Sequence, residues 1–496
     1  MIVASFLCFL AMFVVVGVSS YRYSRGDSAD YLLAGQGVRP WLVGLSAVAT
    51  NNSGYMFIGV IGYTYVTGLP AAWLMIGWIL GDLLASQFVH ARLRTATGAR
   101  GEHTFAGILA NWHGEQFVWL RRLGGLVTVA FLGAYAAAQL TAGSKALHVL
   151  FGWDAWVGAV IGAVIVLVYC LAGGIRASIW TDAAQSFVMI IAMSVLLVVA
   201  VTHLGGPAAA LEQLDAVSPT YMNWLPTGLA LGDGLGPVLF IVGWMFAGFS
   251  VIGQPHIMVR FMALDDAKNM RRARIWYYSW FTAFYIAANS VGLLSRVLLP
   301  AEGFDAELAL PTIALELLPD VLVGLILAGV FAATMSTADS LILSCSAALT
   351  DDLAKGAGRR LVVVKAGTVL VTTMALLIAL TGTDSVFSLV IYAWSVLAAA
   401  FGPLLVVLAL GQRPRESLAI TMMIIGVACV YAWKAVPVLA DYYEGMGGFL
   451  AGFAVFAVGR MLGFSEAAEA RDQTRDGEAE GASGELEGGS LLDPGR

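Results

Sequence analysis

Five consecutive polar or small residues, Thr50 to Gly54, interrupt an otherwise apolar segment of the chain. Asn and Ser side chains compete for backbone hydrogen-bonding groups and glycine loosens the backbone, so the run favours an unwound break over a continuous helix. Backbone carbonyls freed by a break inside a membrane can coordinate a cation. The alternative is that these side chains only hydrogen-bond to neighbouring helices. The length of the run favours the cation site.

A second polar group lies in the apolar stretch AATMSTADSLILSCS, where Ser336 and Thr337 are adjacent and Asp339 and Ser340 follow one turn later. Two hydroxyls and freed carbonyls would give a small hard cation an all-oxygen shell without burying net negative charge. A Ser-Thr pair alone more often bonds back to its own helix. The cation interpretation therefore depends on the break at Thr50 to Gly54.

A third interruption, at Gly248, Phe249 and Ser250, falls in the apolar segment 236–256. Two interrupted helices, each opening one half of the chain, are typical of inverted-repeat transporters, whose sites lie at the membrane midplane. The two halves show no visible sequence similarity to each other.

The composition requires a membrane protein. Of the 496 residues, 59% are hydrophobic and 12% are charged, against about 25% charged in an average soluble domain. Apolar runs of about 20 residues match the hydrocarbon core of a bilayer. The sequence predicts an all-α bundle of thirteen transmembrane helices, at 2–20, 38–66, 70–92, 123–150, 155–172, 178–203, 236–256, 275–299, 320–350, 362–381, 386–410, 417–435 and 446–463.

Lys and Arg fall almost entirely in alternate connections between these helices, and the positive-inside rule makes those connections cytoplasmic. The opposite connections, including 204–235 and 300–319, contain no Lys or Arg. The N-terminus is therefore predicted outside and the C-terminus inside, which requires an odd number of spans. The cytoplasmic set is Arg22, Arg25, Arg92, Arg94, Arg100, Arg121, Arg122, Arg176, Arg260, Lys268, Arg271, Arg272, Arg274, Lys355, Arg359, Arg360, Arg413 and Arg415.

The chain divides into a transmembrane transporter domain, 1–464, and a tail, 465–496. Nine of the 33 acidic residues lie among the last 32 positions, which lack any apolar period. Such a segment cannot bury enough surface to offset its ordering entropy. We expect a disordered acidic cytoplasmic tail.

Several motifs resemble the sodium/solute symporter family, most closely its bacterial sodium/proline branch. The resemblance extends from about residue 20 to about residue 435. The motifs are DYLLAGQGVRPW at 30–41, LSAVATNNSGY at 45–55, GGIRASIWTDAAQS at 173–186, GQPHIMVRFMA at 253–263, MSTADS at 335–340, SAALTDDL at 346–353 and YAWSVLAAAFGP at 392–403.

The resemblance implies a LeuT-type core of two five-helix inverted repeats, approximately 38–203 and 236–410. It also implies a sodium site between the second and ninth spans. The site would use the backbone carbonyls of Ala49, Asn52 and Ala333 and the hydroxyls of Ser336 and Thr337.

Asp182, at the cytoplasmic end of the sixth span, matches a family acid associated with sodium release. The alternative is that Asp182 is an interfacial acid paired with Arg176.

For the solute, Ser53, Gly54 and Tyr55 resemble the family's substrate-proximal stretch, and Tyr135 matches an aromatic residue of the proline pocket. Asn51 and Trp244 complete the expected solute site.

Three departures from the proline branch leave the solute open. Asn51 replaces an aspartate that is important for sodium use, although asparagine also occurs there in the sodium/sugar branch. Gln36 replaces an arginine. Ala247 and Val251 align with a pocket Trp and Tyr, with Trp244 one turn earlier.

The resemblance thus implies a sodium-coupled symporter of the bacterial inner membrane that imports a small neutral or zwitterionic solute, with L-proline as the first choice. Another amino acid, an osmolyte or another small organic solute remains an alternative, as does proton coupling. The lipid bilayer is an expected partner and nucleic acid is not. An enzyme is not expected, since the six histidines are scattered and form no HExxH. A channel would share the hydropathy.

Overall fold

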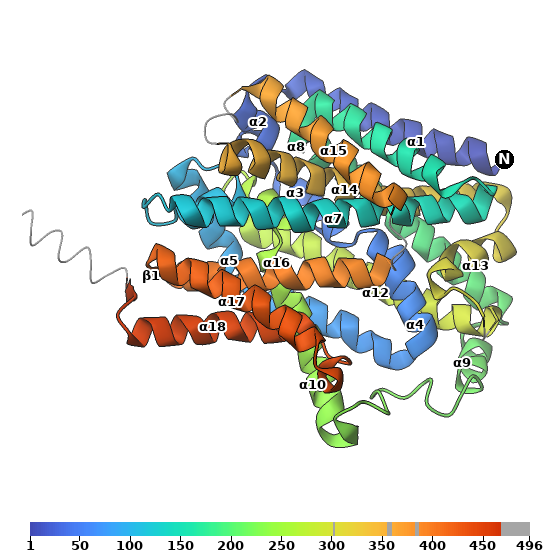
Figure 1. Ribbon diagram of the computed structural model, residues 1–496. Coiled ribbons are helices and arrows are strands. Elements are labelled where there is room, and N and C mark those ends of the chain that lie inside the picture. Colours follow the sequence, from blue (N-terminus) through green and yellow to red (C-terminus); the bar gives the residue numbers. More distant parts are fainter. Residues whose placement is uncertain (301–302, 355–359, 382–385, 468–496) are drawn as a thin grey trace, which may run out of the picture.

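The computed structural model describes residues 1–300, 303–354, 360–381 and 386–467, and these residues form a bundle of long helices lying side by side (Figure 1). The helices are α1 (Ile2–Ser19), α2 (Ser28–Leu33), α3 (Pro40–Asn51), α4 (Ile61–Thr67), α5 (Ala72–Arg100), α6 (Phe105–Ala110), α7 (Val118–Phe151), α8 (Ala155–His203), α9 (Pro207–Asp215), α10 (Gly232–Phe249), α11 (Pro255–Met262), α12 (Met270–Leu298), α13 (Ala309–Leu317), α14 (Asp320–Ala347), α15 (Leu361–Thr381), α16 (Val386–Ala409), α17 (Glu416–Lys434) and α18 (Glu444–Met461). Two short strands, β1 (Gln412–Pro414) and β2 (Ser465–Ala467), complete the described elements.

Ten helices in the described part of the chain are long and apolar enough to cross a membrane. Many large apolar side chains, such as Val15, Leu84 and Leu377, are exposed on the outside of the bundle. An outer surface of this kind suits contact with lipid chains. The protein is therefore a multi-pass, all-α membrane protein.

Both predicted interruptions are present. Helix α3 ends at Asn51, and Asn52 leaves the helical region with φ −88° and ψ 48°. The chain continues through a π-helical segment, Tyr55–Val60, into α4. Helix α10 likewise ends at Phe249, and a 3₁₀ segment, Ser250–Gly253, leads into α11 at Pro255.

The predicted helices 155–172 and 178–203 are both present and lie within α8, where they meet at the non-helical residue Gly174. This residue has φ 55° and ψ −138°, and a Cβ placed there would lie 2.3 Å from the carbonyl oxygen of Tyr31. A backbone conformation that L side chains rarely adopt and the close approach of Tyr31 both require glycine. The expected loop at 173–177 is thus a sharp kink.

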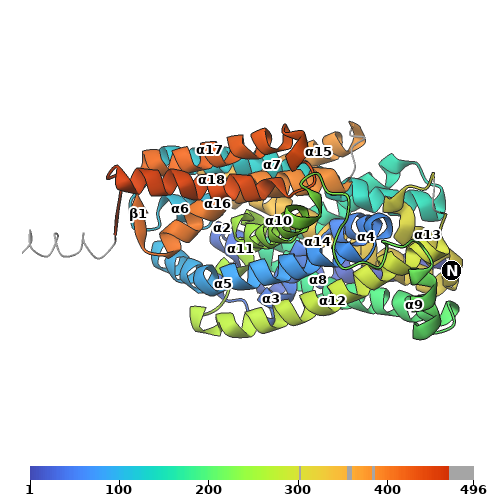
Figure 2. The same ribbon diagram turned by 90° about the horizontal axis from the view of Figure 1, so that it is seen from below.

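The broken helix α3 lies at the centre of the bundle, in contact with α8, α11, α12 and α14. Helices α17 and α18 pack on each other and on α16 along one side (Figure 2). Figures 1 and 2 both place the N-terminus, with α9 and α13, at the end of the bundle opposite β1.

The prediction of disorder from Ser465 onward is wrong for its first three residues. Ser465–Ala467 form β2, which pairs antiparallel with β1, and the amide of Arg415 donates a 2.9 Å hydrogen bond to the carbonyl of Phe464. The Arg415 guanidinium also lies over the Phe464 ring. Local backbone pairing orders this segment without an apolar period. The rest of the predicted tail lies outside the described residues.

Candidate cation and solute site

The break after α3 frees backbone carbonyls in the middle of the bundle. In a continuous helix the amides of Gly54 and Tyr55 would donate to the carbonyls of Thr50 and Asn51. Instead the Gly54 amide donates to Oε1 of Gln139 at 2.8 Å, and the Tyr55 amide donates to the Ser53 hydroxyl at 3.1 Å. The carbonyl oxygens at the end of α3 are therefore available to other partners.

Two hydroxyls of α14 reach these carbonyls. The Ser336 hydroxyl lies 3.1 Å from the carbonyl oxygen of Ala49 and 3.0 Å from that of Ala333. The Thr337 hydroxyl donates to the carbonyl of Thr50 at 2.9 Å. All five of these residues are inaccessible to solvent. The structure thus brings together four of the five predicted sodium ligands and adds the carbonyl of Thr50.

The fifth predicted ligand, Asn52, lies in the break itself, fully buried. Its side-chain oxygen and nitrogen have no hydrogen-bond partner among the described residues. Uncharged oxygens of this kind suit a small hard cation. The described residues contain no cluster of three His, Cys, Asp or Glu side chains that could hold a metal ion.

A buried group of charged side chains adjoins the α3–α14 contact. The Arg260 guanidinium lies 3.4 Å from Oδ2 of Asp182 and 3.7 Å from Oδ1 of Asp339, and all three side chains are inaccessible to solvent. The Thr50 hydroxyl connects the two regions, because it lies 3.1 Å from the Ser340 hydroxyl and 3.4 Å from Oδ2 of Asp182. We call Asp182, Arg260 and Asp339 the buried charge cluster.

Hydroxyl groups satisfy much of the remaining bonding capacity of this cluster. Ser46 donates to Oδ2 of Asp182 at 2.6 Å, and Ser178 donates to Oδ1 of Asp339 at 2.8 Å. Arg260 donates to Ser178 at 2.6 Å and also to Ser340. The attraction between opposite charges and the hydrogen bonds offset part of the cost of removing these groups from water.

Two sequence interpretations are corrected by these pairs. Arg176 pairs with Asp30 and donates to the Ala34 carbonyl, so it is not the partner of Asp182. Arg260, assigned from charge alternation to a cytoplasmic connection, is fully buried. The distribution of Lys and Arg along the sequence does not reveal that Arg260 is buried, because α11 is a short helix that continues the broken α10 into the bundle.

Tyr55, the first residue of the π-helical segment, belongs to a ring of aromatic side chains that contact one another in sequence. Tyr55 lies 6.0 Å from Trp78, Trp78 lies 5.0 Å from Trp394, Trp394 lies 6.1 Å from His256 and His256 lies 5.6 Å from Tyr135, all between ring centroids. Tyr135 closes the ring by donating to the Ser53 hydroxyl at 3.1 Å. We call these five side chains the aromatic ring.

Several buried polar atoms of this ring have no hydrogen-bond partner in the described part of the chain. They are the Tyr55 hydroxyl, Nε1 of Trp78 and both ring nitrogens of His256. Buried polar groups are normally paired, so these atoms are candidates to bind a polar solute.

Gly54 lies beside the ring, where a Cβ would be 2.5 Å from Cγ2 of Thr334. Only glycine allows the broken backbone to approach α14 this closely.

The other two predicted solute residues lie elsewhere. Asn51 points to α12, where its Nδ2 donates to the Tyr277 hydroxyl at 2.5 Å. Trp244 contacts Tyr63 and Tyr443 rather than the aromatic ring. Sequence reasoning missed Gln139, His256, Trp78 and Trp394, although His256 lies in the quoted GQPH motif and Trp394 in YAWS.

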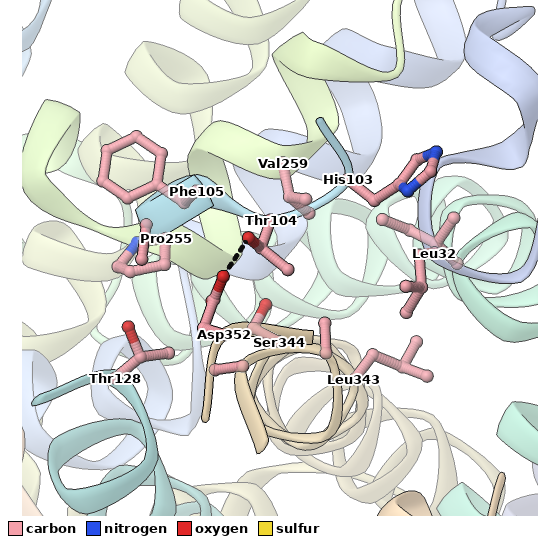
Figure 3. A pocket seen from close by; sticks show the side chains of 14 residues that line it. Leu32, His103, Thr104, Phe105, Thr128, Pro255, Val259, Leu343, Ser344 and Asp352 are labelled. Atoms are coloured by element: carbon pink, nitrogen blue, oxygen red, sulfur yellow. Dashed lines mark hydrogen bonds between the residues drawn. The ribbon is translucent and has the colours of Figure 1, made fainter. Parts of the chain in front are cut away.

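A pocket lies at the end of α14 beyond the buried charge cluster. It is lined by residues of α11 and α14 and by the segment 103–106, and the Thr104 hydroxyl donates to Oδ1 of Asp352 at 2.6 Å across it (Figure 3). Arg121 holds the same oxygen at 2.9 Å. Ser336, Ser340, Ser344 and Asp352 recur at intervals of four or eight residues, so they follow one face of α14 and its extension from the Ser336 region to this pocket.

Solved structures show which fold this is. The structure matches a Na⁺-coupled sialic acid symporter, solved substrate-bound and outward-open, with a TM-score of 0.77 at 20% identity over 93% of this chain and 98% of that chain. It also matches MhsT, solved with L-phenylalanine, with a TM-score of 0.57 at 15% identity over 84% of this chain and 97% of that chain. These similarities establish the fold of LeuT-type transporters.

The family follows from sequence. The model of the sodium:solute symporter family matches residues 31–426. The chain is 30% identical to the high-affinity proline transporter PutP of Bacillus subtilis, over 88% of this chain and 93% of that protein. It is 31% identical to a sodium/proline symporter of Staphylococcus aureus, over 86% of this chain and 84% of that protein. The chain belongs to the sodium:solute symporter family: it is a sodium-coupled transporter and not an enzyme.

Proposed function

We propose that this chain imports L-proline together with sodium across the inner membrane of a bacterium. The observation that carries the proposal is the contact of Ser336 and Thr337 with the carbonyls of Ala49 and Thr50 at the break after α3. The relatives named above are proline transporters by name and match most of this chain. The proposal includes thirteen spans, with the N-terminus outside and the C-terminus in the cytoplasm. The N-terminus and β1 lie at opposite ends of the bundle (Figure 1), and β2, the last described element, pairs with β1. The two ends of the described chain therefore lie at opposite ends of the bundle, which supports an odd number of spans.

Sodium would bind at the crossing of α3 and α14. The ligands are the carbonyls of Ala49, Asn52 and Ala333 and the hydroxyls of Ser336 and Thr337, with the Thr50 carbonyl as a further candidate. A hydroxyl that now donates to a carbonyl can rotate its proton away and offer a lone pair to the ion. Sodium would then bind both helices at once, and its affinity would depend on how they are arranged.

The solute would bind inside the aromatic ring. The unpaired polar atoms of Tyr55, Trp78 and His256 would bind the charged ends of a zwitterion, and the ring faces would pack on its apolar part. Ala247 lacks the aromatic surface expected at that position, but the Trp394 indole donates to the Ala247 carbonyl and brings aromatic surface from α16. A compact solute such as proline suits this arrangement.

The arrangement is closed on the predicted outer side. Phe387 stacks on Tyr55 at 5.3 Å and on Tyr63 at 5.2 Å, and Lys145 pairs with Glu307, which also accepts a hydrogen bond from the Phe387 amide. The buried charge cluster and the Thr104–Asp352–Arg121 contacts close the predicted inner side. We interpret the structure as an occluded state between outward-open and inward-open arrangements.

Asp182 would take part in sodium release. It reaches the Thr50 hydroxyl, one residue from the Ala49 ligand, and its charge is shared with Arg260. As the inner side opens, the ion would pass along the polar face of α14, from Ser336 past Ser340 and Ser344 to Asp352.

The driving force is sufficient for accumulation. One sodium ion moving through about 100 mV provides about 2.3 kcal/mol, and a tenfold gradient adds about 1.4 kcal/mol. The total of about 3.7 kcal/mol supports roughly 500-fold accumulation of a solute without net charge.

Uptake of labelled proline into proteoliposomes tests this function. We expect uptake to require an inward sodium gradient, to increase with a negative internal potential and to stop when potassium replaces sodium. Equal uptake in potassium at constant pH would contradict sodium coupling. Sodium-driven uptake of other zwitterions but not of proline would contradict the solute assignment and leave the symporter intact.

A further inference from the structure

A groove of about 640 Å³ lies on the outer surface of the bundle, between the end of α1, the start of α3 and the middle of α8. Three of the side chains that line it are largely exposed: Tyr23, Trp41 and Phe187 have exposed fractions of 62%, 38% and 49%. The proposed sodium and solute sites do not use this groove. Its lining combines aromatic, basic and apolar side chains.

The groove runs from an aromatic end to an apolar end. Trp180, Ala184 and Phe187 of α8 line it at intervals of four and three residues, so they follow one face of the helix. At 1.5 Å per residue this row extends about 10 Å. Tyr23 lies at the Trp180 end, where the two ring centroids are 5.2 Å apart. Val16 of α1 adds to the apolar lining.

The aromatic end also carries an unbalanced positive charge. Arg176 lies one turn before Trp180, pairs with Asp30 and donates to the carbonyl of Ala34 at 2.9 Å, which brings the segment before α3 to this end. Arg39, in that segment, lines the groove and is exposed, and it makes no ion pair within the described chain. None of the described residues that line the groove is acidic. Arg39 is therefore a cation without a counter-charge from the protein.

We propose that this groove binds a phospholipid with an anionic headgroup. The Arg39 guanidinium would pair with the headgroup phosphate, and the row from Trp180 to Phe187 would contact an acyl chain. Trp and Tyr side chains are characteristic of the boundary between headgroups and hydrocarbon, which places Tyr23, Trp41 and Trp180 at that boundary.

Both the charge and the shape of the groove favour an anionic lipid over other ligands. A lipid with a net negative headgroup would neutralise Arg39, whereas a zwitterionic lipid already carries its own cation. A free anion such as phosphate would pair with Arg39 and leave the apolar row uncovered. In the proposed orientation this end of the bundle faces the cytoplasm, where basic pockets between spanning helices bind anionic headgroups.

Native mass spectrometry of the purified, delipidated full-length protein with added phospholipid tests this proposal without sodium or solute. We expect the wild type to bind phosphatidylglycerol at least about fivefold more tightly than phosphatidylcholine. Arg39→Gln should bind the two lipids equally, and Arg39→Lys, which keeps the charge, should keep most of the preference. Arg271→Gln is the matched control and should keep the full preference, because Arg271 is an exposed arginine at the start of α12 that makes no ion pair within the described chain and does not line the groove.

Two further measurements test where the lipid binds and what is recognised. Ala184→Trp fills the middle of the groove without changing its charge and should weaken phosphatidylglycerol binding at least about fivefold. Soluble glycerol phosphate, which has no acyl chain, should not displace the lipid.

Equal affinity of the wild type for the two lipids overturns the proposal, and so does an unchanged preference in Arg39→Gln. Unchanged phosphatidylglycerol binding in folded Ala184→Trp would place the lipid elsewhere and overturn it as well. If Ala184→Trp does not fold, the exposed position of Arg39 still gives the decisive variant. Displacement by glycerol phosphate would overturn the lipid assignment in favour of a soluble anion.

Discussion

The Thr337 hydroxyl donates a 2.9 Å hydrogen bond to the carbonyl oxygen of Thr50, across 287 positions of the sequence. This bond exists because α3 stops at Asn51 and leaves the Thr50 carbonyl without its helical donor. It joins the broken helix to α14 at the place where the proposed sodium ion would bind. An ion that holds two helices together in this way stabilises one arrangement of the transporter over another.

The buried charge cluster should be needed for folding, and Arg260 more than Asp182. Arg260→Met would leave two buried carboxylates without a cation, and breaking such a pair costs about 3–5 kcal/mol. Asp182→Asn leaves Arg260 paired with Asp339. We expect a large loss of melting temperature in Arg260→Met and a small one in Asp182→Asn, measured by thermal unfolding in detergent. Equal melting of Arg260→Met and the wild type would contradict the role of the cluster.

The close packing of α5 on α10 should not tolerate a methyl group at Gly81. A Cβ at this position would lie 2.0 Å from the carbonyl oxygen of Met245, and overpacking of this kind costs about 1–3 kcal/mol. Gly133→Ala in α7 is the control, because nothing lies within 4 Å of its Cβ. Gly81→Ala should melt at a lower temperature than the wild type and Gly133→Ala should not. Equal melting temperatures of Gly81→Ala and Gly133→Ala would show that the contact between α5 and α10 accepts a methyl group without loss of stability.

Phe387 should hold the solute by closing the outer side. Phe387→Ala removes two stacked pairs, with Tyr55 and Tyr63, each contributing about 0.5–1.5 kcal/mol. We expect a higher apparent KM for proline in Phe387→Ala, by roughly tenfold, and a near-normal value in Phe387→Tyr, which keeps the ring. An unchanged KM in Phe387→Ala would argue against closure by this ring.

Ser344 should control passage on the inner side. Its side chain lines the pocket in Figure 3, on the same face of α14 as Ser336 and Ser340. Ser344→Leu should slow net uptake while leaving the external sodium dependence unchanged, and Ser344→Ala should behave like the wild type. Uptake and sodium titration in proteoliposomes measure both quantities. Normal turnover in Ser344→Leu would place the exit path elsewhere.

The sequence predicted the elements of the site better than their partners. The run Thr50 to Gly54 and the patch at Gly248 to Ser250 mark both breaks, because polar and small residues in an apolar segment are visible locally. Arg260 and Asp182 are 78 positions apart, and no local pattern shows that they meet. Gln139 was missed for the same reason. Its position in an apolar helix does not indicate that its side-chain oxygen accepts a hydrogen bond from the Gly54 amide.

Two other differences between the predicted and the observed fold arise from the backbone, and the amino-acid composition does not predict them. The connection predicted at 173–177 is shorter in the structure, because the non-helical backbone of Gly174 joins the two helical parts of α8 directly. The short pairing of β2 with β1 orders Ser465–Ala467 through main-chain hydrogen bonds, which do not require apolar side chains. Both features depend on neighbours that are distant in the sequence.

The sodium dependence of proline uptake in Thr337→Ala tests the sodium site at the crossing of α3 and α14 most directly. Thr337→Ser, which keeps the hydroxyl, is the matched control. We expect the sodium concentration for half-maximal uptake to rise at least about tenfold in Thr337→Ala and to stay near the wild-type value in Thr337→Ser. A sodium dependence in Thr337→Ala identical to that of the wild type would contradict the site.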